Sequence, residues 1–332
     1  MTQSYDIRFS TSKDKKQILC LLNQVFQNQQ RFDWIRDEDF WSWKYESNVF
    51  GKPIIHVIEH NGKVVGSGTL WPWKFISRGE VFNVYQPCDT TIDLAYQGKG
   101  LFSLLNRHRL PIIGDMDVPF VFNFPNTNSL PGYLKFNWRY LAKMPWMLKV
   151  LNPIGTFRLL QSKEKSAPFE IAKEDIVDPS NCELVSETND QVYFSNLIST
   201  YREKGFFSWR YSKHPFFKYG QVIVEQGKKK TGAIFSIYNK GNSREMVVVD
   251  IFGNPNLTSL LFNQIQEKAK SYQVDYIACL YNRHFNMNVL WKKGYFKVKN
   301  KNMVVLPFDL RLENQLTNYR NWNMIAAMHD AI

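Results

Sequence analysis

The stretch Gln97-Gly98-Lys99-Gly100-Leu101 places two glycines on either side of a lysine, directly after a strand-like segment. Apolar side chains then recur at helical spacing, and we expect that helix to end at Pro111. A glycine-rich turn that opens a helix suits a phosphate group, because helix N-termini carry unpaired N–H groups and glycine lets the backbone approach an anion. An ordinary tight turn has the same residues.

Two common phosphate motifs do not explain this stretch. The chain contains no Gly-Lys-Ser or Gly-Lys-Thr, which excludes a P-loop. The dinucleotide-binding fold needs a parallel βαβ unit, whereas the segments around the glycines predict mostly antiparallel strands.

The first half of the chain alternates strand and helix patterns. A helix is predicted around residues 18–26, and two apolar runs joined by Asn61-Gly62 predict a hairpin. His56 and His60 belong to the first of those runs, so their spacing does not indicate a metal site, and we predict none. Strands are also predicted at 81–92 and 118–124, with a helix or turn at 128–136. The pattern predicts an α/β (α+β) fold with a mostly antiparallel mixed sheet flanked by helices.

The second half repeats the first weakly. "FWSWKY" at 40–45 corresponds to "FFSWRY" at 206–211, and each is followed by a hairpin, the second with "GKKKTG" at its tip. Lys44 and Arg210 occupy matching places, which favours a structural ion pair in each copy. A Pro- and Lys/Glu/Ser-rich stretch at 151–181 is typical of a linker. We therefore predict two tandem domains, residues 1–155 and 156–332.

Charge and cysteine content narrow the class of protein. The 332 residues carry a formal net charge of +12, which suits nucleic acid, anionic lipid or phosphorylated small molecules. The four cysteines lack the paired spacing of zinc sites or disulfide frameworks. No apolar run reaches the length of a membrane span, and the first residues do not read as a secretory signal. We expect a reduced cytoplasmic protein that binds neither membrane nor nucleic acid.

The glycine stretch resembles the acyl-CoA pyrophosphate loop of the GCN5-related N-acetyltransferase (GNAT) superfamily, written Arg/Gln-x-x-Gly-x-Gly/Ala. Phe102 departs from that pattern at its last position. A second element follows: Asn126, Ser129 and Tyr133 resemble the spacing Asn-x-x-Ala-x-x-x-Tyr, with Trp138 at the aromatic end and Asn137 in place of the customary Gly. The second copy lacks the paired glycines and has Leu290 where Tyr133 stands, so we expect a degenerate domain that serves as scaffold and acceptor wall.

The resemblance implies direct transfer of an acyl group from acyl-CoA to an amine, without metal. Tyr133 matches the residue whose hydroxyl donates to the CoA sulfur. A bulge in the fourth strand would free backbone N–H groups at Asp89 to Ile92, and Asp89 is the first candidate for a general base, although the amine alone could suffice. The cofactor-binding residues implied are Thr90, Thr91, Ile92, Gln97, Gly98, Lys99, Gly100, Leu101, Phe102, Asn126 and Ser129.

The acceptor is suggested by a looser resemblance. "FWSWKY", "PNTNSLPGYLKF" and the tandem layout resemble bacterial surface-polysaccharide transferases, in particular those that N-acylate dTDP-linked 3-amino-3,6-dideoxyhexoses with acetyl or 3-hydroxybutyryl groups. Two phosphorylated ligands would suit the positive charge. Candidate acceptor-side aromatic residues are Trp41, Trp71, Trp73, Tyr85 and Trp209, although a Trp at strand or helix spacing usually packs in a core.

Three other functions remain open from the sequence. One is an aminoacyl-tRNA-dependent transferase acting on peptidoglycan precursors, which would not need acyl-CoA. Another is an acetyltransferase of a protein or of another small amine. The third is a nucleic-acid binder without transferase activity, although no recognisable nucleic-acid module is present. Since a tandem chain supplies within itself the pairing that single-copy members obtain from two subunits, we predict a monomer.

Overall fold

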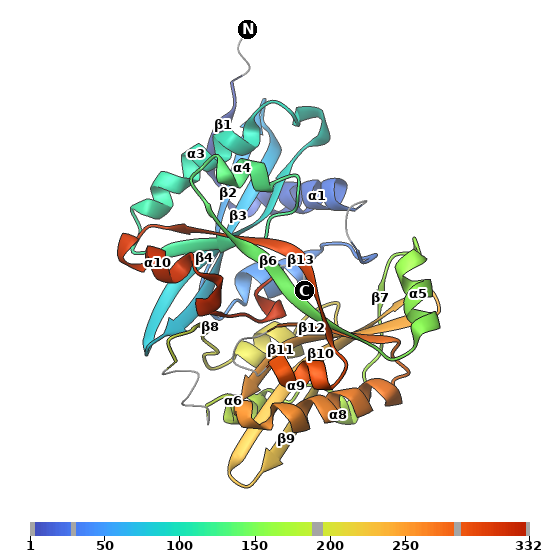
Figure 1. Ribbon diagram of the computed structural model, residues 1–332. Helices are drawn as coiled ribbons and strands as arrows, with labels where there is room; N and C mark the ends of the chain where they lie inside the picture. The colour runs from blue at the N-terminus through green and yellow to red at the C-terminus, as the bar shows by residue number, and fades with distance from the viewer. Residues whose placement is uncertain (1–3, 28–30, 188–194, 282–286, 330–332) are drawn as a thin grey trace. The chain divides into compact units, whose positions relative to one another are not determined.

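The computed structural model describes residues 4–27, 31–187, 195–281 and 287–329. Two compact units make up the chain, and each combines segments that are distant in sequence (Figure 1). The first unit contains Met1–Lys74, Phe82–Ala142 and Lys301–Tyr319. The second unit contains Phe75–Val81, Lys143–Asn300 and Arg320–Ile332. In the part of the chain that is described, no helix is both long and apolar enough to cross a bilayer.

The first unit is built on a mixed sheet with the strand order β1-β2-β3-β4-β5-β13. β1 with β2, β2 with β3, and β5 with β13 pair antiparallel, whereas β4 pairs parallel with β5. The strands are β1 (Asp6–Phe9), β2 (Ile54–His60), β3 (Lys63–Ser77), β4 (Glu80–Ile92), β5 (Phe120–Asn123) and β13 (Phe296–Pro307). The predicted hairpin is confirmed: Asn61 and Gly62 join β2 to β3 with φ of 50° and 76°, the left-handed values that this turn requires.

Helices of the first unit follow the predicted apolar spacing. Ile18, Leu21 and Leu22 are buried on one face of α1. The helix expected to end at Pro111 continues to Gly114, because Ile113 beyond the proline is fully buried in the core and anchors the last turn. The helical segments are η1 (Ser12–Asp14), α1 (Lys15–Phe26), α2 (Glu38–Trp41), the π-helical turn η2 (Ser42–Glu46), η3 (Leu94–Tyr96), α3 (Leu101–Gly114), α4 (Leu130–Leu134), η7 (Leu310–Leu312) and α10 (Glu313–Leu316).

The second unit repeats the same combination of sheet and helices. Its strands are β6 (Arg139–Val150), β7 (Ala167–Pro168), β8 (Ile198–Thr200), β9 (Gly220–Gln226), β10 (Lys229–Lys240), β11 (Ser243–Gly253), β12 (Tyr276–Leu280) and β14 (Trp322–Asn323). Its helical segments are α5 (Pro153–Gln161), η4 (Lys173–Asp175), α6 (Pro179–Glu187), the π-helical turn η5 (Ser208–Ser212), η6 (Pro255–Leu257), α8 (Thr258–Ser271), α9 (Met287–Lys292) and η9 (Ala326–Met328). A further short turn, η8 (Tyr319–Asn321), lies at the unit boundary.

Each unit pairs one of its strands with a strand from the other half of the chain. β9, β10, β11 and β12 pair antiparallel, antiparallel and parallel in succession, and β12 then pairs antiparallel with β6 from the first half of the chain. In the first unit the corresponding neighbour of β5 is β13, from the end of the chain. The units therefore cannot be separated by one cut, unlike the single boundary predicted at residues 155 and 156.

Residues 151–181 form structure where a linker was expected. Asn152 caps α5, accepting a hydrogen bond on Oδ1 from the Gly155 N–H at 3.3 Å, and its Nδ2 donates to Asp275 at 2.8 Å. Leu159 of the same helix is buried. Pro153 and Pro179 begin α5 and α6, Asn152 caps α5, and Pro168 lies in strand β7 of the second unit. The "GKKKTG" stretch lies at the tip of the β9–β10 hairpin as predicted, with Gly227 and Lys228 in the turn and the rest in β10.

Candidate functional site

β4 and β5 pair over a very short distance. Among the described residues, their parallel register is confined to Tyr85 and Val121. Further along β4, Asp89 has φ of 47°, a left-handed value that is rare for a residue with a side chain and marks an irregularity within the strand. Among the described residues, Thr90 to Ile92 beyond it have no partner in the β4–β5 register. This is the region where the bulge was predicted.

The glycine stretch follows immediately and opens α3. Gly98 and Gly100 have φ of 76° and 77°, and Gly100 is the left-handed N-cap of the helix. A Cβ atom at either glycine would meet open space. No side chain caps this end of α3, so the unpaired N–H groups of its first turn are available to an anion. The geometry fits a pyrophosphate group.

The side chains around the loop have separate roles. Gln97 Nε2 donates to the Ile92 carbonyl oxygen at 3.1 Å, which ties the loop to the end of β4. Lys99 Nζ lies 4.7 Å from the centre of the Tyr96 ring. Leu101 is buried in an apolar cluster with Leu105. These contacts hold the loop from behind and leave the glycine backbone on the open side.

Phe102 stands where the motif has a small residue, and its ring fits because a small residue of another helix makes room for it. Its ring packs against Gly132 of α4, where an added Cβ would lie only 2.7 Å from Phe102 Cε1. The Phe102 and Tyr133 rings also meet edge to face, with their centres 5.5 Å apart. The small residue expected at position 102 is therefore found at position 132, across the α3–α4 contact.

Tyr133 on α4 presents a hydroxyl group with a defined orientation. The Phe124 N–H donates to Asn123 Oδ1 at 2.7 Å, which fixes the Asn123 amide so that its Nδ2 donates to the Tyr133 hydroxyl oxygen at 2.6 Å. The tyrosine oxygen is thus an acceptor on its protein side, and its own hydrogen can point elsewhere. Burial raises the pKa of Tyr133 above its ordinary value, with the charge of Arg109 opposing that rise. The hydroxyl is protonated at neutral pH.

The other residues of the second motif shape the start of α4. Asn126 Oδ1 accepts hydrogen bonds from the Ser129 N–H at 2.9 Å and from Ser129 Oγ at 3.0 Å. Asn137 has φ of 64°, the conformation that the customary glycine would adopt, and asparagine is one of the few residues that tolerate it. Trp138 is buried with its ring centre 5.0 Å from that of Tyr133.

Asp89 lies in a buried ion pair. Its Oδ2 accepts hydrogen bonds from Lys44 Nζ and from the Tyr45 hydroxyl, each at 2.5 Å, and the Lys44 and Asp89 side chains are 1% and 6% exposed. Burial by itself would raise the pKa of Asp89, but the charges of Lys44 and Arg36 and the hydrogen bonds from Lys44 and Tyr45 together outweigh burial, and the pKa lies below its ordinary value. A carboxylate held ionised by a buried lysine is a poor proton acceptor, so the geometry gives Asp89 a structural role instead of the general-base role expected from the sequence.

Four of the five predicted acceptor-side aromatic residues are packed in cores. Trp71 and Trp73 are fully buried in the first unit, and Trp41 is 8% exposed there. Trp209 is 2% exposed in the second unit. Tyr85, which lies where β4 and β5 pair, is the one of the five that is half-buried. These four large aromatic rings, which recur at strand or helix spacing, pack in the cores of the two units.

The second unit keeps the ion-pair architecture but not the loop. Tyr211 of η5 donates to Asp250 Oδ2 at 2.8 Å, just as Tyr45 of η2 donates to Asp89. The cation differs: Arg202 pairs with Asp250, whereas Arg210, which matches Lys44, donates to the Ala327 carbonyl oxygen at 3.0 Å. The predicted ion pair is found for Lys44, and Arg210 contacts the Ala327 and His329 carbonyl oxygens.

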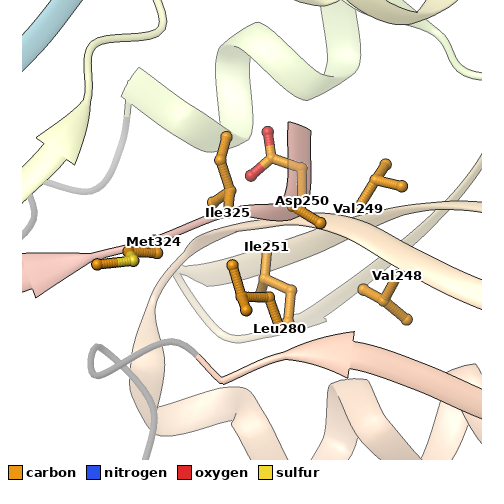
Figure 2. A pocket seen from close by; sticks show the side chains of 8 residues that line it. Val248, Val249, Asp250, Ile251, Leu280, Met324 and Ile325 are labelled. Carbon is orange, nitrogen blue, oxygen red and sulfur yellow. The ribbon is translucent and has the colours of Figure 1, made fainter. Parts of the chain in front are cut away.

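In the second unit, side chains occupy the region that corresponds to the end of β4 in the first unit. The parallel β11–β12 register ends at Val248 and Cys279. The next residues line a cavity of about 10 Å³, enough for roughly one water molecule. Residues from the end of the chain close it (Figure 2), and the lining is Val248, Val249, Asp250, Ile251, Leu280, Met324, Ile325 and Ala326. Leu290 on α9, in the place of Tyr133, is buried and offers no hydroxyl.

Three contributors to the site were not recognised in the sequence. Asn123 orients Tyr133. The sequence feature that could have indicated this role is its position at the end of a buried strand, directly before Phe124. Tyr45 completes the Asp89 pair, although the repeated "SWKY" and "SWRY" marked its position. Arg109 belongs to α3 and is fully buried. Within the described residues, no group of three or more His, Cys, Asp or Glu side chains is arranged to hold a metal ion.

Comparisons with known proteins agree with this geometry. Residues 6–141 match the family model described as "Acetyltransferase (GNAT) domain". A search of curated proteins finds no significant match. Of the solved structures, a GCN5-related N-acetyltransferase from Anabaena variabilis has a TM-score of 0.62 and 14% identity, over 92% of this chain and 73% of that one.

Two further structures show the same fold over nearly the whole chain. Eis1 from Mycobacterium abscessus has a TM-score of 0.56 and 10% identity, covering 95% of this chain and 76% of that one. Saccharomyces cerevisiae N-myristoyltransferase with bound myristoyl-CoA and inhibitors has a TM-score of 0.57 and 12% identity, covering 98% and 85%. The family match spans the glycine loop, the irregular part of β4 and Tyr133 together, so residues 6–141 are similar to a GNAT acetyltransferase domain.

Proposed function

We propose that the protein is an acyl-CoA-dependent N-acyltransferase whose acyl-CoA site lies in the first unit. The observation that carries this proposal is one arrangement: β4 has a left-handed residue at Asp89, and after the short turn η3 an open glycine turn begins α3. Nearby, the Tyr133 hydroxyl oxygen accepts a hydrogen bond from Asn123, which leaves its own hydrogen available to donate. The second unit, with its filled opening, serves as scaffold and as part of the acceptor side.

The chemistry follows from these groups. The α3 N-terminus would hold the pyrophosphate, and backbone groups beyond Asp89 would orient the pantetheine arm and the thioester carbonyl. The amine nitrogen forms a bond to the carbonyl carbon, and the carbon–sulfur bond then breaks with its electron pair on sulfur. Tyr133 donates its proton to that sulfur, and the proton lost by the amine returns through solvent to the tyrosine oxygen. No covalent enzyme intermediate is needed.

For the acceptor we propose the amine of a nucleotide-linked aminosugar, with a dTDP-linked 3-amino sugar as the first candidate. The support is the net charge of +12, which suits two phosphorylated ligands, together with the sequence resemblance described above. The acyl group would be acetyl or 3-hydroxybutyryl. We expect a monomer, which light scattering at micromolar concentration would test.

Thiol release tests this function. The purified protein would be given acetyl-, 3-hydroxybutyryl- and longer acyl-CoAs, each against dTDP- and UDP-linked aminosugars, and free CoA would be followed with a thiol dye. We expect release that depends on one nucleotide aminosugar. Release only with other amines would overturn the acceptor, and failure to bind CoA would overturn the whole proposal in favour of tRNA-dependent transfer.

A substitution in the loop should separate the anion site from general stability. Gly98→Ala should weaken acyl-CoA binding about fivefold or more, because a side chain at this left-handed φ costs roughly 1 kcal/mol or more and displaces the backbone from the anion. Gly62→Ala is the matched control, since Gly62 has the same φ of 76° and the same open space in the β2–β3 turn. Calorimetric titration with acetyl-CoA would measure both variants, and equal losses of affinity would contradict the prediction.

A further inference from the structure

Arg109 is a buried cation held by a neutral group. Its side chain lies on the inner face of α3 and is 0% exposed. Nε and Nη2 both donate to Asn106 Oδ1, at 3.1 and 2.8 Å, and Asn106 Nδ2 donates to the Phe102 carbonyl oxygen at 2.8 Å. The third guanidinium nitrogen, Nη1, is buried and has no hydrogen-bond acceptor among the described residues.

No carboxylate compensates this charge. Among the residues that the structure describes, none forms a salt bridge with Arg109. The titratable groups that face it are Tyr133 on α4, Cys88 on β4 and His56 on β2. Burial, then the charges of His108 and Arg109, lower the pKa of His56 to about 4, so that ring is neutral. A buried cation without a counter-ion is costly, and one that is retained beside a reactive group suggests a negative charge to be stabilised.

The position of Arg109 connects it to the opening in the sheet. Nη1 lies 3.3 Å and Thr90 Oγ1 lies 3.4 Å from the point where a Cβ on Gly68 would stand, so the absence of a side chain at Gly68 makes room for both. Thr90 Oγ1 is buried and lacks a partner as well. The same guanidinium neighbours the Tyr133 hydroxyl. Arg109 thus lies between the broken part of β4 and the proton donor of the proposed reaction.

We propose that Arg109 is a positioning residue whose buried positive charge stabilises the negative charge that develops on the CoA sulfur, acting through the Tyr133 hydroxyl. This inference rests on the proposed function. When the carbon–sulfur bond breaks, the electron pair passes to sulfur, and the proton of Tyr133 moves toward it. The charge is then shared between sulfur and tyrosine oxygen, next to the Arg109 guanidinium group. Asn123 completes the set by holding the tyrosine oxygen in place.

Binding of free CoA against desulfo-CoA tests this without an acceptor or turnover. The two ligands differ at the sulfur, so the ratio of their dissociation constants reports the site's preference for thiolate. As pH rises from about 6 to the ordinary thiol pKa of about 8.5, the wild-type protein should come to prefer CoA over desulfo-CoA by a further factor of about five or more. The reason is that an adjacent opposite charge moves a pKa by about 1–3 units. Arg109→Met should abolish the shift, and Arg109→Lys should retain part of it.

The controls separate this role from a structural one. Arg107→Met removes an exposed arginine from the same helix and should leave the shift unchanged. Arg109→Met should melt no lower than the wild type, because it removes a buried charge that has no counter-ion. If CoA and desulfo-CoA bind equally at every pH, or if Arg109→Met keeps the full shift, the inference fails while the proposed function stands. If neither ligand binds, both fail.

Discussion

Replacing Tyr133 by phenylalanine should slow acyl transfer about a hundredfold while leaving acyl-CoA affinity nearly unchanged. The substitution removes the proton donor, and general acid catalysis by a positioned side chain contributes roughly 10²–10⁴ in rate. The ring itself, packed against Phe102 and Trp138, would remain. Steady-state thiol release would give kcat, and calorimetric titration with a non-reacting acyl-CoA analogue would give affinity.

The pH dependence of acyl transfer gives a second test of the Tyr133→Phe variant. Because burial raises the pKa of Tyr133, its hydroxyl stays protonated through the neutral range and should cause no loss of rate there as pH rises. The defect of the phenylalanine variant should therefore be present at every pH near neutrality. Tyr140→Phe is a matched control, since that exposed hydroxyl contacts Asn302 and has no place in the mechanism. Full activity in Tyr133→Phe would show that the thiolate leaves without a tyrosine acid.

Asp89→Asn should destabilise the first unit by about 3–5 kcal/mol, because it leaves the Lys44 ammonium buried without a counter-ion. Chemical denaturation followed by circular dichroism would measure the loss. Asp250→Asn is the matched variant in the second unit, where Arg202 and Tyr211 surround the carboxylate, and it should cost a similar amount there.

A compensating substitution separates this role from catalysis. Adding Lys44→Met to Asp89→Asn removes the stranded charge and should recover much of the lost stability, with acyl transfer recovering in parallel. A stable Asp89→Asn protein whose rate collapses and loses its dependence on a group titrating at acid pH would instead identify Asp89 as the general base.

Local patterns were sufficient for most of the first unit. The Asn61-Gly62 hairpin, the helix at Ile18–Val25 and the glycine loop before α3 each depend on neighbours within a few residues, and each was predicted. The prediction that the helix ends at Pro111 was wrong, because burial of Ile113 holds the helical turn beyond the proline. The prolines at 153 and 179 misled similarly, since a helix start and a linker use the same residues.

From the sequence alone one can predict the type of each element and the chemistry that its motifs can carry. These motifs are a turn that suits an anion and a tyrosine at the right spacing, and the second copy lacks both. The tertiary structure decided which strands pair, because β6 and β13 have the same local pattern and either could follow β5. It also decided the state of the buried charges. Asp89 and Arg109 are both polar residues in the sequence, and only the fold gives one a lysine and leaves the other without a carboxylate. Burial makes that difference decisive, since charges interact far more strongly away from water.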